Sequence, residues 1–233
     1  MNFSGNAGQQ QTQKTGLERF IVQDEYLKDR RGQYAERYGA LSPWRGKWDV
    51  KFLQDLKVSE DKISDQKLFV FGNLPYNIST EILSKWILNV GSNFWFESLV
   101  LMFQKEVADR IISEFNSSKY GRLSILSSWK LNVKKIIDIK PQSFSPRPKI
   151  DSSLLLFTPK ENFFKLKDPK NLEKITRIFF SQRRKMLKKP FNQVFDNGKE
   201  VAEKFGIDLN LRPQNLEPEV YFKLVKEYED LRG

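Results

Sequence analysis

KLFVFGNLPYNIST, residues 67–80, is the stretch that decides the fold. It begins with a short run of apolar, β-favouring residues that stops at Gly72, and it continues into a turn rich in Asn and Pro. Residues 80–90 then carry apolar side chains at helical spacing, and SLVLMFQ at residues 98–104 is a second strand-like run. A strand, a helix and a strand in this order predict a parallel sheet in an α/β domain.

The rest of the chain predicts an α/β part followed by a helical part. Further elements are expected, in chain order, as helices over 106–115 and 122–131, strands over 133–139 and 152–158, and helices over 172–186, 198–206 and 218–231. The two later strands would form an antiparallel edge of the sheet. We therefore expect an α/β domain over residues 56–160 and a small all-α C-terminal domain over residues 161–233.

The first 55 residues have a different texture. Residues 1–16 are small and polar, which predicts a flexible tail because such residues cannot offset the entropy lost on ordering. Residues 17–55 are dense in charged and aromatic residues and show no clear helical or strand period.

The charge balance favours an anionic partner. The 233 residues include 40 Lys and Arg against 29 Asp and Glu, a net charge of +11, which suits RNA, DNA or an acidic membrane surface, although a generally basic proteome would give the same balance. The absence of Cys and His from the sequence excludes disulfides, thiol nucleophiles and the commonest general base. The sequence has no long apolar run and no signal-peptide core, so we expect a cytoplasmic protein without a membrane partner.

The turn after the first strand has groups suited to an adenine amine, whose lone pair is delocalised into the ring. Ligands of open parallel sheets bind just beyond the carboxyl ends of the strands. There, the side-chain oxygen of Asn73 and the backbone carbonyl of Leu74 would accept the two amine hydrogens and direct the lone pair at an electrophilic methyl group. Pro75 would fix the backbone, and Tyr76 would stack on the base. The alternative is an ordinary strand-to-helix turn, with a hydroxyl of residues 79–80 capping the helix.

Segments spread over much of the chain carry a resemblance to one family. They are, in order, VFGNLPYNIST at 70–80, MFQKEVADRI at 102–111, YGRLS at 120–124, FSPRPKIDSS at 144–153 and FFSQRRKMLKK at 179–189. In this order they resemble the motifs of the rRNA adenine dimethyltransferases. The resemblance implies a truncated Rossmann-like methyltransferase sheet and an enzyme that moves two methyl groups in succession from S-adenosylmethionine to one adenine amine of small-subunit rRNA. It also implies in-line transfer without a covalent enzyme intermediate, ribosomal RNA as the partner, and a monomer.

The same resemblance assigns roles to individual residues. Residues 73–76 would form the methyl-transfer and adenine site, with Asn73 also bordering the cofactor. Phe144 would be the second aromatic that sandwiches the flipped base. Asp55, within QDLKV, matches the acidic position that contacts the adenine of the cofactor. The alternative for Phe144 is a core aromatic beside a proline turn.

Basic residues indicate two places of RNA contact. Arg147 and Lys149 flank the loop of Phe144 and would hold phosphates. A second cluster, expected at the end of the helix over 172–186, consists of Arg183, Arg184, Lys185, Lys188 and Lys189. That helix would turn its apolar side chains toward a core, namely Ile175, Ile178, Phe179, Met186 and Leu187. A basic rim suits the phosphate backbone of folded rRNA. The alternatives are solvated surface charges and cations favoured at a helix C-terminus.

The start of the chain departs from the family pattern. Family members carry a GQNFL-like segment and a glycine-rich EIGxGxGxLT loop that hold S-adenosylmethionine, and residues 1–55 contain neither. Residues 17–55 resemble instead a segment near the C-terminus of TonB-dependent outer-membrane receptors, which predicts a chimeric reading frame joined near Gln54. Without the first strands of the family sheet, Leu68–Phe71 would form an unpaired apolar edge, prone to aggregation.

Different features of the sequence therefore favour different functions. The ordered motifs favour an rRNA adenine dimethyltransferase. The missing glycine-rich loop favours a non-catalytic RNA-binding fragment of such an enzyme. Residues 17–55 alone would favour an envelope protein, against which the lack of a signal peptide counts.

Overall fold

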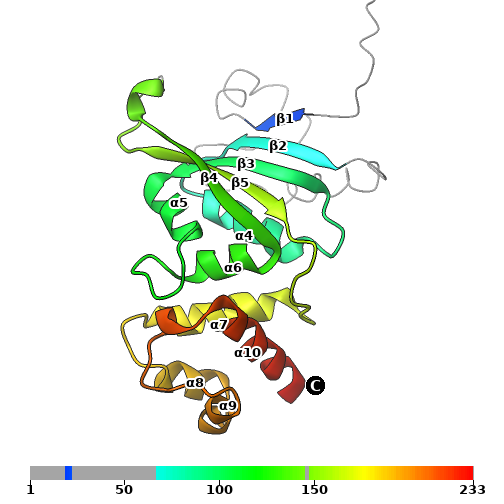
Figure 1. Cartoon of the computed structure of the whole chain (residues 1–233), viewed down its shortest axis with the longest axis vertical. Coiled ribbons are helices and arrows are strands. Elements are labelled where there is room, and N and C mark those ends of the chain that lie inside the picture. Colours follow the sequence, from blue (N-terminus) through cyan, green and yellow to red (C-terminus); the bar gives the residue numbers. More distant parts are fainter. Residues whose placement is uncertain (1–18, 23–66, 145–146, 233) are drawn as a thin grey trace, which may run out of the picture.

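A twisted sheet, a layer of helices against it and a second group of helices beyond that layer make up the described part of the chain (Figure 1). The computed structural model describes residues 19–22, 67–144 and 147–232. The predicted tail over residues 1–16 lies outside these residues, as does most of the segment 17–55.

The sheet joins a parallel half to an antiparallel half. Its strands are β1 (Arg19–Val22), β2 (Leu68–Asn73), β3 (Phe96–Gln104), β4 (Leu131–Ile139) and β5 (Ser152–Pro159). Their order is β1-β2-β3-β5-β4. β1, β2 and β3 run parallel, whereas β5 runs antiparallel to both β3 and β4. The predicted α/β class, with an antiparallel edge on a parallel sheet, is confirmed.

The sequence of β2 explains its fit in the sheet. Successive side chains of a strand point to opposite faces, so Val70 is buried against the helices while Phe71, on the other face, is 42% exposed. Gly72 lies against Leu101 of β3, where an added Cβ would stand 2.9 Å from the leucine side chain. Glycine therefore permits the close approach of β2 to its neighbour just before the strand ends.

The helices form two groups. The first group, α4 (Ser79–Asn89), α5 (Lys105–Ile111) and α6 (Arg122–Lys130), lies between the sheet and the second group (Figure 1). The second group comprises α7 (Pro169–Ser181), α8 (Lys188–Val194), α9 (Gly198–Lys204) and α10 (Pro218–Leu231), and two short 3-10 helices are η2 (Pro141–Ser143) and η3 (Pro213–Asn215). Helix α10 has the predicted bounds.

The predicted helix over 172–186 is wrong at its end, because α7 stops at Ser181 and α8 is a separate helix. The backbone N–H groups of Leu187 and Lys188 donate to the carbonyls of Leu211 and Leu209, at 2.9 and 3.3 Å, instead of continuing the helix. Consequently Met186, expected in the core, is 58% exposed. The buried positions Ile175, Phe179 and Leu187 agree with the prediction.

The segment of residues 164–168, which joins the α/β part to the second group of helices, is held by hydrogen bonds from both. The indole N–H of Trp129, on α6, donates to the backbone carbonyl of Phe164 at 2.7 Å. The carboxylate of Glu229, on α10, accepts the backbone N–H groups of Lys167 and Asp168, both at 2.9 Å. These contacts fix the α/β part and the helical part in one relative orientation.

The edge of the sheet differs from the prediction. β1 pairs in parallel with β2 from Arg19 opposite Phe69 to Val22 opposite Gly72, so residues 69–71 of the predicted unpaired edge are paired. β1 has the sequence RFIV, which is rich in β-favouring residues, and its backbone pairs with that of β2. Four residues are too few to show a strand period, so the sequence did not predict this strand. Within the described residues, no helix is long and apolar enough to cross a membrane.

Candidate active site

The turn after β2 is held by its own backbone. Asn73 is the last residue of β2, is half-buried and lies opposite Met102 of β3. Leu74 is buried, and the carbonyl of Pro75 accepts the N–H groups of residues 78 and 79, at 3.1 and 3.0 Å. The turn therefore presents the Asn73 side chain and the Leu74 backbone at the carboxyl end of a parallel strand, where ligands of α/β sheets bind.

Helix α4 begins without the side-chain cap that belonged to the alternative of an ordinary strand-to-helix turn. Its N-cap residue is Ile78, which makes no such hydrogen bond. The hydroxyl of Ser79 instead donates back to the carbonyl of Tyr76 at 3.2 Å. The serine thus fixes the backbone of Tyr76, which an ordinary capping role would not do.

Tyr76 reaches across the end of β3 to β5. Its hydroxyl lies 2.6 Å from the hydroxyl of Ser152, the first residue of β5. Ser152 pairs with Gln104 of β3 and Ile139 of β4, and its own surface is fully buried. The half-buried ring of Tyr76 is therefore anchored at its tip by a rigid part of the sheet.

Phe144 lies in the loop that joins β4 to β5, directly after η2. It is half-buried, and its N–H donates to the carbonyl of Pro141 at 3.2 Å. In Figure 1 this loop extends beyond the body of the sheet. The base of the loop meets the end of β3, because the N–H of Lys105 donates to the carbonyl of Asp151 at 2.9 Å. The loop thus starts from the same edge of the sheet as the turn, and the stacking role of Phe144 stays a prediction.

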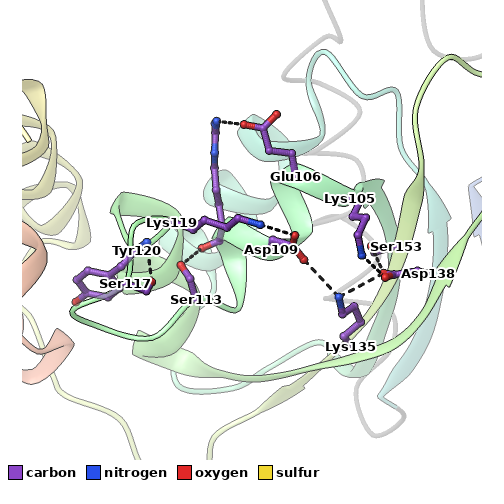
Figure 2. A network of polar contacts seen from close by, with 11 residues as sticks. Lys105, Glu106, Asp109, Ser113, Ser117, Lys119, Tyr120, Lys135, Asp138 and Ser153 are labelled. Carbon is purple, nitrogen blue, oxygen red and sulfur yellow. Dashed lines mark hydrogen bonds and ion pairs between the residues drawn. The ribbon is translucent and has the colours of Figure 1, made fainter.

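A network of ion pairs beside this edge joins α5 to β4 and β5 (Figure 2). Asp138, on β4, accepts hydrogen bonds from Lys105 and from the hydroxyl of Ser153, the latter at 2.6 Å. Lys135 lies between Asp138 and Asp109, with N–O distances of 3.4 and 3.3 Å. The network ties the start of α5 to the two strands that carry the loop of Phe144.

The charged state of this network follows from its pairing. The hydrogen bond from Lys105 holds the pKa of Asp138 well below its usual range, and the same bond raises the pKa of Lys105. Lys119, 2.7 Å from Asp109, lowers the pKa of that carboxyl. These groups stay ionised around neutral pH, so they brace the site and are unsuited to exchanging protons with a substrate.

A groove in the helical part gathers most of the predicted basic cluster. It encloses about 710 Å³. Five of the residues that line it are cations, four are uncharged and none is acidic. The lining residues are Gln182, Arg184, Lys185, Met186, Lys188, Lys189, Asn192, Asn210 and Arg212. We refer to this surface as the basic groove. Arg212 and Asn210 were not predicted, because they follow α9 and are distant in sequence from the basic run.

Not every predicted basic residue lies in the basic groove. Arg183 turns inward: its guanidinium donates to the side chain of Gln214 at 3.3 Å and to the carbonyl of Ser117 at 3.2 Å. Arg147 and Lys149 are exposed in the loop between β4 and β5. Figure 1 shows that loop and α8 at opposite ends of the described molecule. Asp55 lies outside the described residues.

The fold and the comparisons with known proteins agree on one class. The architecture is that of the Rossmann-like α/β proteins, and it matches the crystal structure of a dimethyladenosine transferase from Plasmodium falciparum with a TM-score of 0.57 over 78% of this chain and 80% of that chain. At 24% sequence identity, this likeness shows the fold alone. The family model described as ribosomal RNA adenine dimethylase matches residues 47–230, so the chain belongs to that family.

Two relatives share higher identity with this chain. One is the ribosomal RNA small subunit methyltransferase A of Pelagibacter ubique (strain HTCC1062), 91% identical over 187 residues, which cover 79% of this chain and 71% of that protein. Another is the protein of the same name from Wolbachia sp. subsp. Drosophila simulans (strain wRi), 40% identical over 197 residues, 82% of this chain and 69% of that protein.

The family match begins at residue 47, whereas the resemblance predicted a start near residue 55. The resemblance of residues 17–55 to outer-membrane receptors finds no support in these comparisons, which identify the family through rRNA methyltransferases.

Proposed function

We propose that this chain is an S-adenosylmethionine-dependent enzyme that dimethylates an adenine amine of small-subunit rRNA. The observation that carries the proposal is the turn of Asn73 to Tyr76 at the carboxyl end of parallel strand β2, in a chain that belongs to the ribosomal RNA adenine dimethylase family. Both the cofactor and the RNA would approach this edge of the sheet.

The residues of the turn divide the work on the base. The Asn73 side-chain oxygen and the Leu74 carbonyl accept the amine hydrogens, so that the lone pair of the nitrogen stays available for attack. Tyr76 stacks on the flipped adenine, and Phe144 closes on its other face. Stacking offsets the loss of the base's own neighbours in the RNA, which is the main cost of flipping.

S-adenosylmethionine, when bound, supplies an electrophilic methyl group. Among the described residues, Asn73 would border it, since this half-buried residue lies at the strand end where the ligands of such sheets bind. Asp55 would contact the adenine of the cofactor. In each transfer the cofactor would leave as its demethylated thioether, and the methylated nitrogen would release one proton to solvent, so the chemistry needs no His or Cys as a catalyst.

The basic groove holds the RNA at a distance from the reacting base. Its five cations face one concavity without an acidic lining residue, so they suit the phosphates of a folded strand. Arg147 and Lys149 would hold phosphates next to the flipped base. In this proposal the protein acts as a monomer on the small subunit.

One observation favours a second function, RNA binding without methyl transfer. Residues 1–66 contain no glycine-rich segment of the kind that holds S-adenosylmethionine in the family, whereas the basic groove and the turn of Asn73 to Tyr76 are present.

Calorimetric titration of the full chain with S-adenosylmethionine separates the two functions. The methyltransferase proposal predicts saturable heat with one site per chain. A folded sample that gives no heat with the cofactor, yet binds rRNA, would establish the RNA-binding alternative. The folded state is checked by circular dichroism on the same sample.

A further inference from the structure

Tyr76 is fixed at both ends of its side chain. At its backbone, the carbonyl accepts the hydroxyl of Ser79 at 3.2 Å. At its tip, the phenol oxygen lies 2.6 Å from the hydroxyl of Ser152. The phenol oxygen lies on the axis of the second side-chain torsion, so an anchor there restricts the first torsion, which sets where the ring lies. The ring therefore has a defined position before any base arrives.

Ser152 is well suited to be that anchor. It is fully buried and lies between β3 and β4, opposite Gln104 and Ile139. A residue paired on both sides in the sheet cannot shift without breaking the strand ladder. The hydroxyl of Ser152 thus holds Tyr76 to a strand that is paired on both sides.

Ser152 is also the first strand residue after the loop of Phe144. The preceding residue, Asp151, accepts the N–H of Lys105 through its carbonyl at 2.9 Å. Its carboxylate accepts the ammonium of Lys140 at 2.8 Å, which closes the base of the loop. The hydrogen bond of Tyr76 to Ser152 therefore connects the turn that holds one aromatic to the base of the loop that holds the other.

We propose that Ser152 is a positioning residue of the adenine site, which sets the position of the Tyr76 ring and fixes the spacing between that ring and the loop of Phe144. This inference rests on the proposed function, because it assumes that Tyr76 stacks on the target base. Ser152 does not touch the base; it acts through Tyr76. A stacking surface that is already in place loses less freedom when the base is captured, so more of the bound RNA has its base in the site.

The test measures base capture separately from methyl transfer. The probe is a single-stranded RNA oligonucleotide with 2-aminopurine in place of one adenine, whose fluorescence changes when the base stacks on an aromatic ring. The variants are Tyr76→Phe, Ser152→Ala and the double variant, and Ser152→Thr keeps a hydroxyl. Ser84→Ala is the control, since it removes a serine hydroxyl that, among the described residues, bonds within α4 to the carbonyl of Thr80.

Each single variant is expected to lower base capture by about fivefold to tenfold, the range for loss of one hydrogen bond. The double variant should lose no more than either single variant, because both remove the same bond. Ser152→Thr should retain capture, and Ser84→Ala should match the wild type. Tyr76→Phe leaves the buried serine intact, so the test holds even if a Ser152 variant fails to fold.

The outcomes separate this inference from the proposed function. Losses that add in the double variant, or normal capture by both Ser152→Ala and Tyr76→Phe, would overturn the positioning role while leaving methyl transfer in place. A wild type that does not capture the base would also overturn it. Capture without methyl transfer from tritiated S-adenosylmethionine to small ribosomal subunits would refute the proposed function and leave the role of Ser152 standing.

Discussion

The turn of Asn73 to Tyr76 and the basic groove differ in how their side chains are held. The turn is fixed by hydrogen bonds from Ser79, Ser152 and its own backbone. In the groove, Arg184, Lys185, Lys188 and Lys189 are exposed, and their charges face one concavity. The difference indicates separate roles: the turn supplies a fixed geometry for methyl transfer, whereas the basic groove supplies positive charge for rRNA affinity.

The largest effect should come from the turn. Asn73→Ala removes an amine acceptor whose value lies in the transition state, so we expect a loss of about 10²–10³-fold in kcat, with little change in RNA affinity. Initial rates of tritium transfer to small ribosomal subunits measure it. Asn77→Ala, which alters an exposed asparagine four residues along, is the matched control. A normal rate for Asn73→Ala would remove the proposed role of the amide.

The groove should show the opposite pattern. Replacing Arg184 and Lys185 by Ala should weaken rRNA binding by about tenfold at low salt and reduce the slope of log affinity against log salt by about 1 to 2, with kcat unchanged. Filter binding at several salt concentrations measures both. Lys199→Ala, an exposed lysine on α9 that pairs with Glu203, is the control. An unchanged slope of log affinity against log salt would show that the basic groove does not contact phosphates.

Arg183 belongs to the basic run in the sequence but does not line the basic groove, so it should behave differently from Arg184 and Lys185. Its guanidinium joins the end of α7 to Ser117 and Gln214. Arg183→Ala should therefore lower stability, by about 1 to 3 kcal/mol for lost charge-assisted hydrogen bonds, and leave the salt slope close to that of the wild type. Urea unfolding and filter binding give the two numbers. A reduced salt slope at wild-type stability would place Arg183 in the RNA contact instead.

The smallest effect concerns pH and the network around Asp138. Because the pKa of Asp138 is lowered in the folded state, its stabilising effect is complete above its unfolded pKa of about 3.9 and is lost as the pH falls through the folded value. Wild type should thus be more stable than Asp138→Asn at pH 7, and the difference should shrink below about pH 4. Urea unfolding at a series of pH values measures it. A constant difference would mean that the carboxylate charge is not what braces α5.

The sequence predicted much of the fold because its signals were local. The strand, turn and helix of residues 67–90 are dense in β-favouring residues, Gly, Pro and helical spacing, and α10 begins at a proline and keeps one amphipathic period to its end. The short β1 escaped detection, since four residues hold too little period. The break between α7 and α8 escaped it too, because it depends on hydrogen bonds from residues 187 and 188 to a segment more than twenty residues away.

The candidate site divides in the same way. The turn of Asn73 to Tyr76 could be proposed as a site from the sequence, because its four residues are contiguous and their types and order are enough to suggest an adenine site. The partner of Tyr76 is 76 residues away, and only the strand order β3-β5-β4 brings Ser152 to it. Arg212 joins the basic groove for a similar reason, since tertiary packing and not sequence spacing places it there.

Nucleoside analysis of the RNA product tests the central claim most directly. Small ribosomal subunits lacking adenine dimethylation would be incubated with S-adenosylmethionine and either the wild-type chain or Asn73→Ala, and the rRNA then digested and examined by mass spectrometry. We expect N6,N6-dimethyladenosine with the wild type and almost none with Asn73→Ala. No dimethyladenosine with a folded, RNA-binding wild type, or equal amounts with both proteins, would contradict it.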